Sequence, residues 1–169
     1  MSADELFELV DESGAVIGRA PRGLCHGNPG LLHQAVHVLV FNAAGELFLQ
    51  RRSLAKDVQP GRWDTSVGGH MAPREKPLES ALREAREELG LDGVPLEFSH
   101  EYLWRTAVET EYVRTYTARC EGPFTLDPGE IEEGRFWSFA EIAAQLGTGV
   151  FTPNFEWEFE RLRAARAGG

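Results

Sequence analysis

The sequence has few cysteines, no excess of basic residues and no long apolar run. Its 169 residues include 2 cysteines, and 17 lysines and arginines stand against 27 aspartates and glutamates, a net charge of −10. Two distant cysteines in a chain of this length argue against a disulfide scaffold and favour a reducing, cytoplasmic location. The acidic balance argues against nonspecific binding to nucleic acid or to a membrane surface, and no segment suits a signal peptide or a membrane span. We therefore expect neither a nucleic-acid nor a membrane partner.

Length and patterning predict a single domain over residues 1–169. Apolar residues make up 42% of the chain, which is enough for a sizeable core, and no linker or repeat divides it. Many strands with few helices predict a layered α/β or α+β domain with a mixed sheet. The oligomeric state stays open. The expected elements are an N-terminal β-hairpin at about 5–20, a second hairpin over 35–41 and 46–52, strands over 96–106, 111–120 and 135–137, and helices over 76–89, 138–146 and 154–165.

The clearest predicted helix spans Lys76 to Leu89. Pro77 lies in its first turn and Gly90 just beyond its end, which is the usual asymmetry of helix termini. A projection at about 100° per residue separates an apolar stripe from an acidic face. The apolar stripe contains Leu78, Ala81, Leu82, Ala85 and Leu89.

The acidic face of this helix contains Glu84, Glu87 and Glu88. Like charges at these spacings cost a few tenths of a kcal/mol per pair, and the helix C-terminus also disfavours anions. A bound cation would offset both costs, and carboxylate oxygens favour Mg²⁺, with Mn²⁺ as a substitute. A solvated acidic surface is the alternative that the helix alone leaves open.

The residues around this helix carry a recognisable spacing. Gly69, Glu75 and the segment 83–91, Arg-Glu-Ala-Arg-Glu-Glu-Leu-Gly-Leu, resemble the Nudix box, Gly-x5-Glu-x7-Arg-Glu-U-x-Glu-Glu-x-Gly-U, in which U is apolar. Every fixed position matches, and Ala85 is smaller than the aliphatic residue often found at the first U. The resemblance implies a Nudix-type α/β/α sandwich with a mixed β-sheet, and a loop-helix-loop metal site.

Roles follow from the resemblance position by position. It implies that Glu84, Glu87 and Glu88 are metal ligands and catalytic residues, with the Gly68 carbonyl as a fourth ligand. It also implies structural support of the loop by Gly69, Glu75 and Arg83. A metal-bound water would attack phosphorus, and a carboxylate would accept its proton. The base is either Glu84 or a loop glutamate among Glu130, Glu132 and Glu133, although that cluster is equally consistent with a solvated turn.

Outside the box the chain is similar to one Nudix branch, the type I isopentenyl-diphosphate isomerases and their hydrolase relatives. The shared segments are 9–11, 26, 30–33, 63–70, 109–111 and 151–153. In the isomerases three histidines and two glutamates form a metal site, and the matching residues here are His26, His33, His70, Glu109 and Glu111. The catalytic cysteine of the isomerases falls on Gly68, and their box is degraded whereas this one is intact. Both departures favour hydrolysis.

Substrate recognition is less constrained by the sequence. A basic stretch could grip a phosphate, and tryptophans could stack on a base, although a charged strand end and core aromatics are the alternatives. The residues concerned are Arg51, Arg52, Lys56 and Arg62, and Trp63 and Trp104.

The intact box leads to one principal prediction of function. We expect a Mg²⁺-dependent hydrolase that cleaves a phosphoanhydride bond in a small-molecule substrate: a nucleoside di- or triphosphate, or a nucleoside diphosphate derivative. Two alternatives remain, an isopentenyl-diphosphate isomerase-like activity and a non-catalytic nucleotide-binding module.

Overall fold

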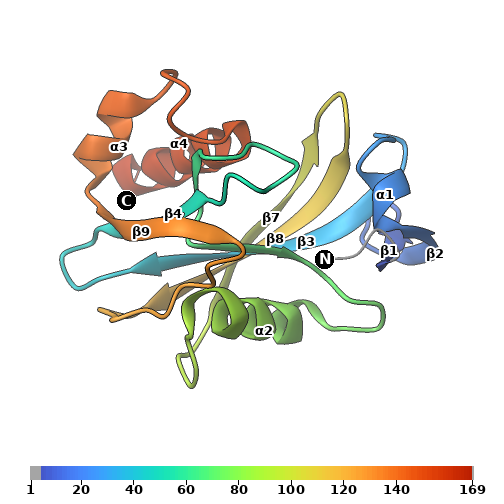
Figure 1. Ribbon diagram of the computed structural model, residues 1–169, viewed down its shortest axis with the longest axis horizontal. Coiled ribbons are helices and arrows are strands. Elements are labelled where there is room, and N and C mark those ends of the chain that lie inside the picture. The colour runs from blue at the N-terminus through green and yellow to red at the C-terminus, as the bar shows by residue number, and fades with distance from the viewer. Residues whose placement is uncertain (1–4, 169) are drawn as a thin grey trace.

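The computed structural model describes residues 5–168 and arranges them as a nine-stranded sheet flanked by helices (Figure 1). The strands are β1 (Leu6–Val10), β2 (Val16–Pro21), β3 (Leu32–Phe41), β4 (Leu47–Arg52), β5 (Trp63–Asp64), β6 (Val67–His70), β7 (Glu97–Arg105), β8 (Thr110–Arg119) and β9 (Ile131–Trp137). The helices are α1 (Arg22–Cys25), α2 (Pro77–Leu89), α3 (Phe139–Gln145) and α4 (Pro153–Ala167). None of these described helices is long and apolar enough to cross a membrane.

Strand β3 lies at the centre of the sheet. It pairs in parallel with β8 along its whole length, from Leu32 opposite Thr110 to Phe41 opposite Arg119. Its other edge pairs with β1, with β6 over residues 35–38, and with β4 at a single position. The expected second hairpin is therefore closed only at its turn, because β6 takes the edge of β3 that β4 would otherwise occupy. Strand β4 pairs instead with β9.

The helices cover opposite faces of the sheet. Helix α2 lies on one side, and α3 and α4 lie on the other (Figure 1). Successive residues of β3 alternate between the two cores, with Val38 and Val40 in the core under α2 and Leu39 in the core that includes Phe155 of α4. This arrangement confirms the α/β/α sandwich with a mixed sheet that the sequence resemblance implied.

Helix α2 begins and ends within one residue of its predicted bounds, with Gly90 in the left-handed conformation at its C-cap. Its buried face is rotated from the predicted stripe. Leu78 and Leu82 remain 44% and 37% exposed, so their placement in the core was wrong. The reason is that the side of α2 that contains Glu88 packs against the sheet. The buried residues are Ser80, Ala81, Ala85, Glu88 and Leu89.

Candidate active site

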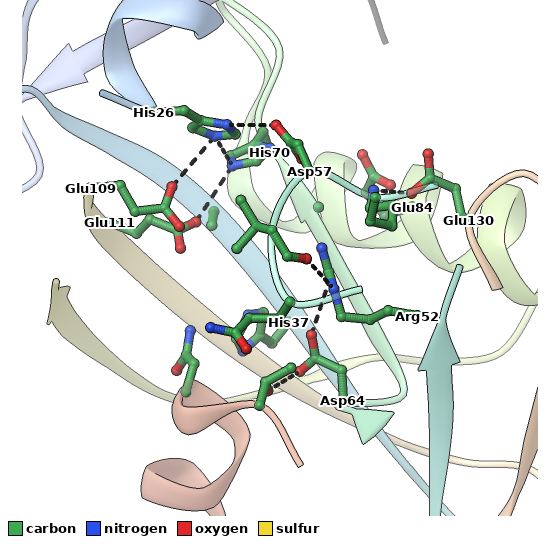
Figure 2. Close-up of a pocket in the computed structure, with 18 of the residues that line it drawn as sticks. His26, His37, Arg52, Asp57, Asp64, His70, Glu84, Glu109, Glu111 and Glu130 are labelled. Carbon is green, nitrogen blue, oxygen red and sulfur yellow. Dashed lines mark hydrogen bonds and ion pairs between the residues drawn. The ribbon is translucent and has the colours of Figure 1, made fainter. Parts of the chain in front are cut away.

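A cavity of about 470 Å³ opens beside the C-terminal half of α2, between β3, β6 and the loop that follows β4. Figure 2 shows its side chains in three groups that face one another. The first is a histidine and glutamate cluster, the second is the acidic side of α2 with a loop glutamate, and the third is a polar end beyond Arg52. The labelled members are His26, His70, Glu109 and Glu111; Glu84 and Glu130; and His37 and Asp64.

Two of the three predicted carboxylates lie where α2 meets β6, with Glu88 buried and Glu84 partly buried. Glu88 is 6% exposed, and its Oε1 accepts hydrogen bonds from Gln50 Nε2 at 2.7 Å and from the Gly68 amide at 3.4 Å. Burial, with Glu84 close by, raises the pKa of Glu88 to about 8, and burial raises the pKa of Glu84 to about 7. A divalent cation between these carboxylates would relieve their desolvation and their mutual repulsion. Glu87 is more exposed and accepts a hydrogen bond from Arg83 at 3.2 Å.

Arg83 joins the loop before α2 to the acidic face. Its guanidinium donates to both oxygens of Glu75, at 2.7 and 3.0 Å, and to Glu84 Oε1 at 2.9 Å. It also donates to the His70 carbonyl at 3.2 Å. Arg83 thus binds the loop through Glu75 and the predicted metal ligand Glu84 at the same time, which is consistent with the support role predicted for Glu75 and Arg83.

Gly69 makes room for Glu84. A Cβ atom at Gly69 would lie 2.2 Å from the Glu84 carboxyl carbon and 2.5 Å from each of its oxygens. Any side chain at this position would therefore displace the carboxylate. This close approach gives a steric reason for the glycine that begins the box.

Two of the predicted phosphate-binding residues, Arg52 and Lys56, line the cavity. Arg52 points into it, and its guanidinium donates to the Val58 carbonyl at 2.9 Å and to Asp64 at 3.2 Å. Lys56, from the same basic stretch, also lines the cavity and forms an ion pair with Glu130.

The other three predicted substrate-binding residues lie away from the cavity lining. Arg51 bonds the Gly61 carbonyl and Glu133, because alternate residues of a strand face opposite sides of the sheet. Arg62 points to the Phe151 carbonyl at 3.5 Å. Trp63 packs edge-on against Trp137 at 5.2 Å in the core under α3 and α4.

The three loop glutamates considered as general bases lie in different surroundings. Glu130 lines the cavity, whereas Glu132 accepts a hydrogen bond from the Leu54 amide and Glu133 pairs with Arg51. Among the three, Glu130 alone faces the α2 carboxylates in this described part of the chain.

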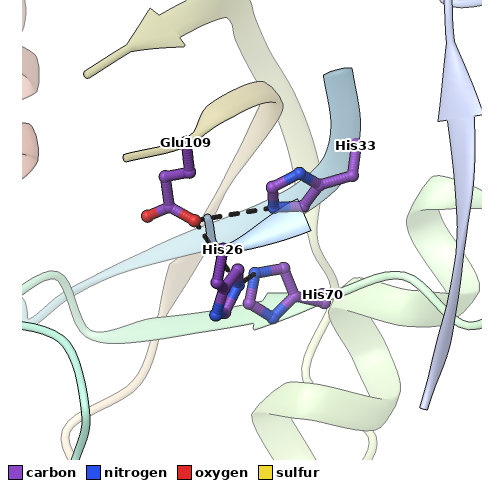
Figure 3. Close-up of side chains that lie close together, drawn as sticks. All are labelled: His26, His33, His70 and Glu109. Carbon is purple, nitrogen blue, oxygen red and sulfur yellow. Dashed lines mark hydrogen bonds and ion pairs between the residues drawn. The ribbon is translucent and has the colours of Figure 1, made fainter. Parts of the chain in front are cut away.

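The five residues matched to the isomerase metal site lie together. His33 stands opposite Glu111 in the β3–β8 register, and His70 ends β6, which brings these strands to one corner. Ligand atoms of four of the residues lie within 4.8 Å of one another (Figure 3), and His70 Nε2 lies 3.5 Å from Glu111. The four are His26, His33, His70 and Glu109.

The electrostatics of this cluster suit a cation. Burial lowers the pKa of His26 to about 4 and also lowers that of His33, so both imidazoles are neutral and able to ligate a metal. Burial next to Glu111 raises the pKa of Glu109. Several buried atoms lack a hydrogen-bond partner among the described residues: His26 Nδ1, His33 Nε2, His70 Nδ1 and Glu109 Oε2. A divalent ion would satisfy the two that face the shared centre, His33 Nε2 and Glu109 Oε2.

The N-terminal hairpin covers this cluster. Phe7 of β1 is 1% exposed, and its ring stacks on His70 at 4.5 Å and on His33 at 5.2 Å between centroids. The hairpin thereby excludes water from one side of the histidines and fixes their ring planes.

Sequence reasoning missed several residues at the cavity. Gln50, which holds Glu88, sits inside β4, and no local pattern distinguishes it from other strand residues. Arg22 on α1 and Asn154 on α4 reach the cavity from distant segments. His37 is the one polar residue in the segment 35–41 of β3, and that is the signal that could have marked it.

Comparison with known proteins agrees with this geometry. The NUDIX domain family model matches residues 31–155. An isopentenyl-diphosphate Delta-isomerase of Streptomyces griseus subsp. griseus is 35% identical over 167 residues, covering 95% of this chain and 83% of that protein. The uncharacterized Nudix hydrolase SCO1686 of Streptomyces coelicolor is 36% identical over 167 residues, covering 98% of this chain and 92% of that protein.

A solved structure shows the same fold. The DR0079 protein of Deinococcus radiodurans superposes with a TM-score of 0.82 at 24% identity, covering 93% of this chain and 98% of that one. The family model covers most of the chain, and the acidic helix, the loop support and the sandwich all agree with it. The chain therefore belongs to the Nudix family.

Proposed function

We propose that this protein is a Mg²⁺-dependent hydrolase of a phosphoanhydride bond in a nucleoside di- or triphosphate or a nucleoside diphosphate derivative. One observation carries the proposal. The buried carboxylate Glu88 and the partly buried carboxylate Glu84 share a cavity with the cationic groups of Arg52 and Lys56. Carboxylates that can hold a cation, beside cations that can hold phosphate, form a site for a metal-bound diphosphate.

Different residues of the chain have different roles in the proposed reaction. Glu84, Glu87 and Glu88 would hold Mg²⁺, which when bound neutralises phosphate charge and lowers the pKa of water. Arg52 and Lys56 orient the diphosphate. Arg83 holds the Glu84 carboxylate in place through its bond to Glu75.

A carboxylate takes the proton of the attacking water. Glu84 is the first candidate, because its carboxylate lines the cavity beside the other carboxylates of α2. Glu130, which lies beside Glu84 in Figure 2, is the second candidate. Its ion pair with Lys56 reduces its availability as a base.

A panel of nucleoside di- and triphosphates with Mg²⁺, assayed for phosphate release, tests this proposal. We expect turnover of at least one nucleotide, and its loss in Glu87→Gln and Glu88→Gln. Glu97→Gln is the matched control, because Glu97 is exposed on β7 and does not line the cavity. Activity that survives in both box variants would overturn the assigned site.

The histidine and glutamate cluster favours a second candidate, an isopentenyl-diphosphate isomerase-like activity. All five matched residues converge, as described above. Gly68, however, supplies no acidic side chain where the isomerases have cysteine. Conversion of isopentenyl diphosphate, followed by product analysis, would support this candidate, and a flat trace at high enzyme concentration would remove it.

A further inference from the structure

Asp64 holds the guanidinium of Arg52 at the polar end of the cavity. Its Oδ2 accepts a hydrogen bond from Arg52 Nη1 at 3.2 Å, and the Arg52 and Asp64 side chains are only 20% and 18% exposed (Figure 2). Arg52 Nε donates to the Val58 carbonyl at 2.9 Å. Because these two nitrogens are held, the guanidinium plane has one orientation. Among residues 5–168 nothing accepts a hydrogen bond from Nη2, which is therefore available to a phosphate oxygen.

Asp64 is itself held in place by two further hydrogen bonds. Its Oδ1 accepts from the Thr65 amide at 2.8 Å and from the Thr152 hydroxyl at 3.0 Å. Thr152 is 3% exposed and caps α4, because its hydroxyl oxygen also accepts from the Phe155 amide at 3.2 Å. The carboxylate of Asp64 therefore cannot turn away from Arg52 without losing its contact with the capping residue of α4.

The backbone that carries Asp64 is anchored on both sides. Strand β5 pairs with β4, and Gln50 of β4 lies opposite Asp64. On the other side, the Trp63 amide donates to the Val150 carbonyl and the Thr152 amide donates to the Trp63 carbonyl, each at 2.9 Å. Asp64 is thus joined both to β4 and to the segment that begins α4, which makes it a rigid support for a neighbouring side chain.

Strand β4 relates this support to the predicted metal ligands. Gln50 and Arg52 are two residues apart on β4. Gln50 donates a hydrogen bond to Glu88, and Arg52 donates one to Asp64, which lies opposite Gln50. One strand therefore sets the position of the phosphate-binding cation relative to a carboxylate that would hold the metal ion.

We propose that Asp64 is a positioning residue, which orients the Arg52 guanidinium so that Nη2 binds the diphosphate of the substrate. The inference rests on the proposed hydrolase function and adds to it a residue to which no role has been assigned. Asp64 acts through Arg52 and does not bind the phosphate itself. Its two carboxylate oxygens are already occupied by Arg52, Thr65 and Thr152.

Asp64 affects diphosphate binding in two ways that have opposite signs. Its negative charge repels the diphosphate, so neutralising the carboxylate would tighten binding if charge alone mattered. Its hydrogen bond to Arg52 keeps a cation in the geometry that a phosphate needs, and loss of such a charge-assisted contact weakens binding about tenfold. Because water and salt screen the repulsion, we expect the loss of positioning to be the larger effect.

Asp64→Asn tests the inference. Asparagine Oδ1 can still accept from Thr65 and Thr152, whereas its Nδ2 cannot accept from Arg52. The probe is methylenediphosphonate in Mg²⁺, measured by calorimetry, because its bridge resists hydrolysis. We expect Asp64→Asn to weaken probe binding about tenfold, and to raise KM for the nucleotide found in the panel by a similar factor with kcat changed less than about threefold. Asp92→Asn is the matched control, because it removes the same charge from an exposed residue outside the cavity lining.

A double-mutant cycle separates positioning from a general loss of structure. If Asp64 acts through Arg52, then adding Asp64→Asn to Arg52→Leu should weaken probe binding no further. Arg52→Lys provides a test that leaves Asp64 unchanged. Lysine keeps the charge but lacks the planar fork that Asp64 and the Val58 carbonyl hold, so this variant should also bind the probe about tenfold more weakly. A thermal melt checks that each variant folds.

Three results would overturn the inference: wild-type or tighter probe binding by Asp64→Asn, an equal loss with and without the Arg52 side chain, or full binding by Arg52→Lys. If the wild-type protein binds the probe and hydrolyses a nucleotide while any of these results is obtained, the positioning role alone is refuted. If the wild-type protein neither binds the probe nor hydrolyses a nucleotide, the proposed function is refuted as well.

Discussion

Replacing Gly69 by alanine would add one methyl group against a carboxylate that the proposed reaction needs. The added Cβ would stand 2.2 Å from the Glu84 carboxyl carbon, whereas real Cβ contacts essentially never fall below 3.0 Å. The carboxyl group must therefore move by at least about 0.8 Å, the difference between these two distances. Gly69 has an ordinary backbone conformation, so the perturbation is steric and not conformational.

A displacement of about 1 Å at a catalytic group costs on the order of 100-fold in rate, which corresponds to about 2.7 kcal/mol of lost transition-state stabilisation. We expect Gly69→Ala to lower kcat/KM by about this factor for the nucleotide that the panel identifies. The assay is steady-state phosphate release in Mg²⁺, with the melting temperature measured in parallel.

Gly18→Ala is the matched control, because a Cβ there meets only Leu9 at an ordinary 3.9 Å. A Gly69→Ala variant that folds and keeps its full kcat/KM would refute the reasoning, since Glu84 could then not be a precisely positioned group in the reaction.

Three further perturbations separate the roles of individual side chains. Arg52→Leu should raise KM about tenfold through loss of a charged hydrogen bond, while Arg51→Leu, on the opposite face, should leave KM within about twofold; equal effects in saturation kinetics would contradict this assignment. Burial raises the pKa of Glu88 from 4.5 to about 8, so the folded state retains a proton that the unfolded state has lost, and this contribution to stability declines as pH rises through that window. In metal-free urea denaturation, Glu88→Gln should therefore gain on the order of 1 kcal/mol or more over wild type from about pH 5 to 8, and a constant difference would argue against a buried carboxyl. Glu158→Leu should cost about 3–5 kcal/mol of unfolding free energy, because His37 loses its buried partner; a change below about 1 kcal/mol would show that this ion pair contributes little.

Local periodicity explains what the sequence predicts well. The helical repeat places Glu84 and Glu88 on one face of α2 regardless of what packs against it, and the structure has them there. The same reasoning wrongly placed Leu78 and Leu82 in the core. A helix wheel shows which residues share a face, but not which face packs against the sheet.

Local sequence patterns could not predict which strand residues face the cavity, because that depends on how the strands pack. Arg51 and Arg52 are indistinguishable in sequence, and only the packing of β4 decides that Arg52 faces the cavity. Gln50 of β4 donates hydrogen bonds to Glu88 of α2 and to the Ser66 carbonyl, and no spacing in the sequence encodes contacts between such distant segments. Trp63 was a candidate for base stacking because it is aromatic, but in the structure it packs against Trp137 in the core.

Strand β3 fixes the length of molecule that this cavity can span. His33, in the histidine and glutamate cluster, and His37, at the other end, are four residues apart on one face of the same strand. At about 3.3 Å per residue they are separated by about 13 Å, and parallel pairing with β8 along all of β3 prevents that spacing from changing. A ligand that touches both ends must match this fixed interval. A compound much shorter than about 13 Å would contact only one end at a time.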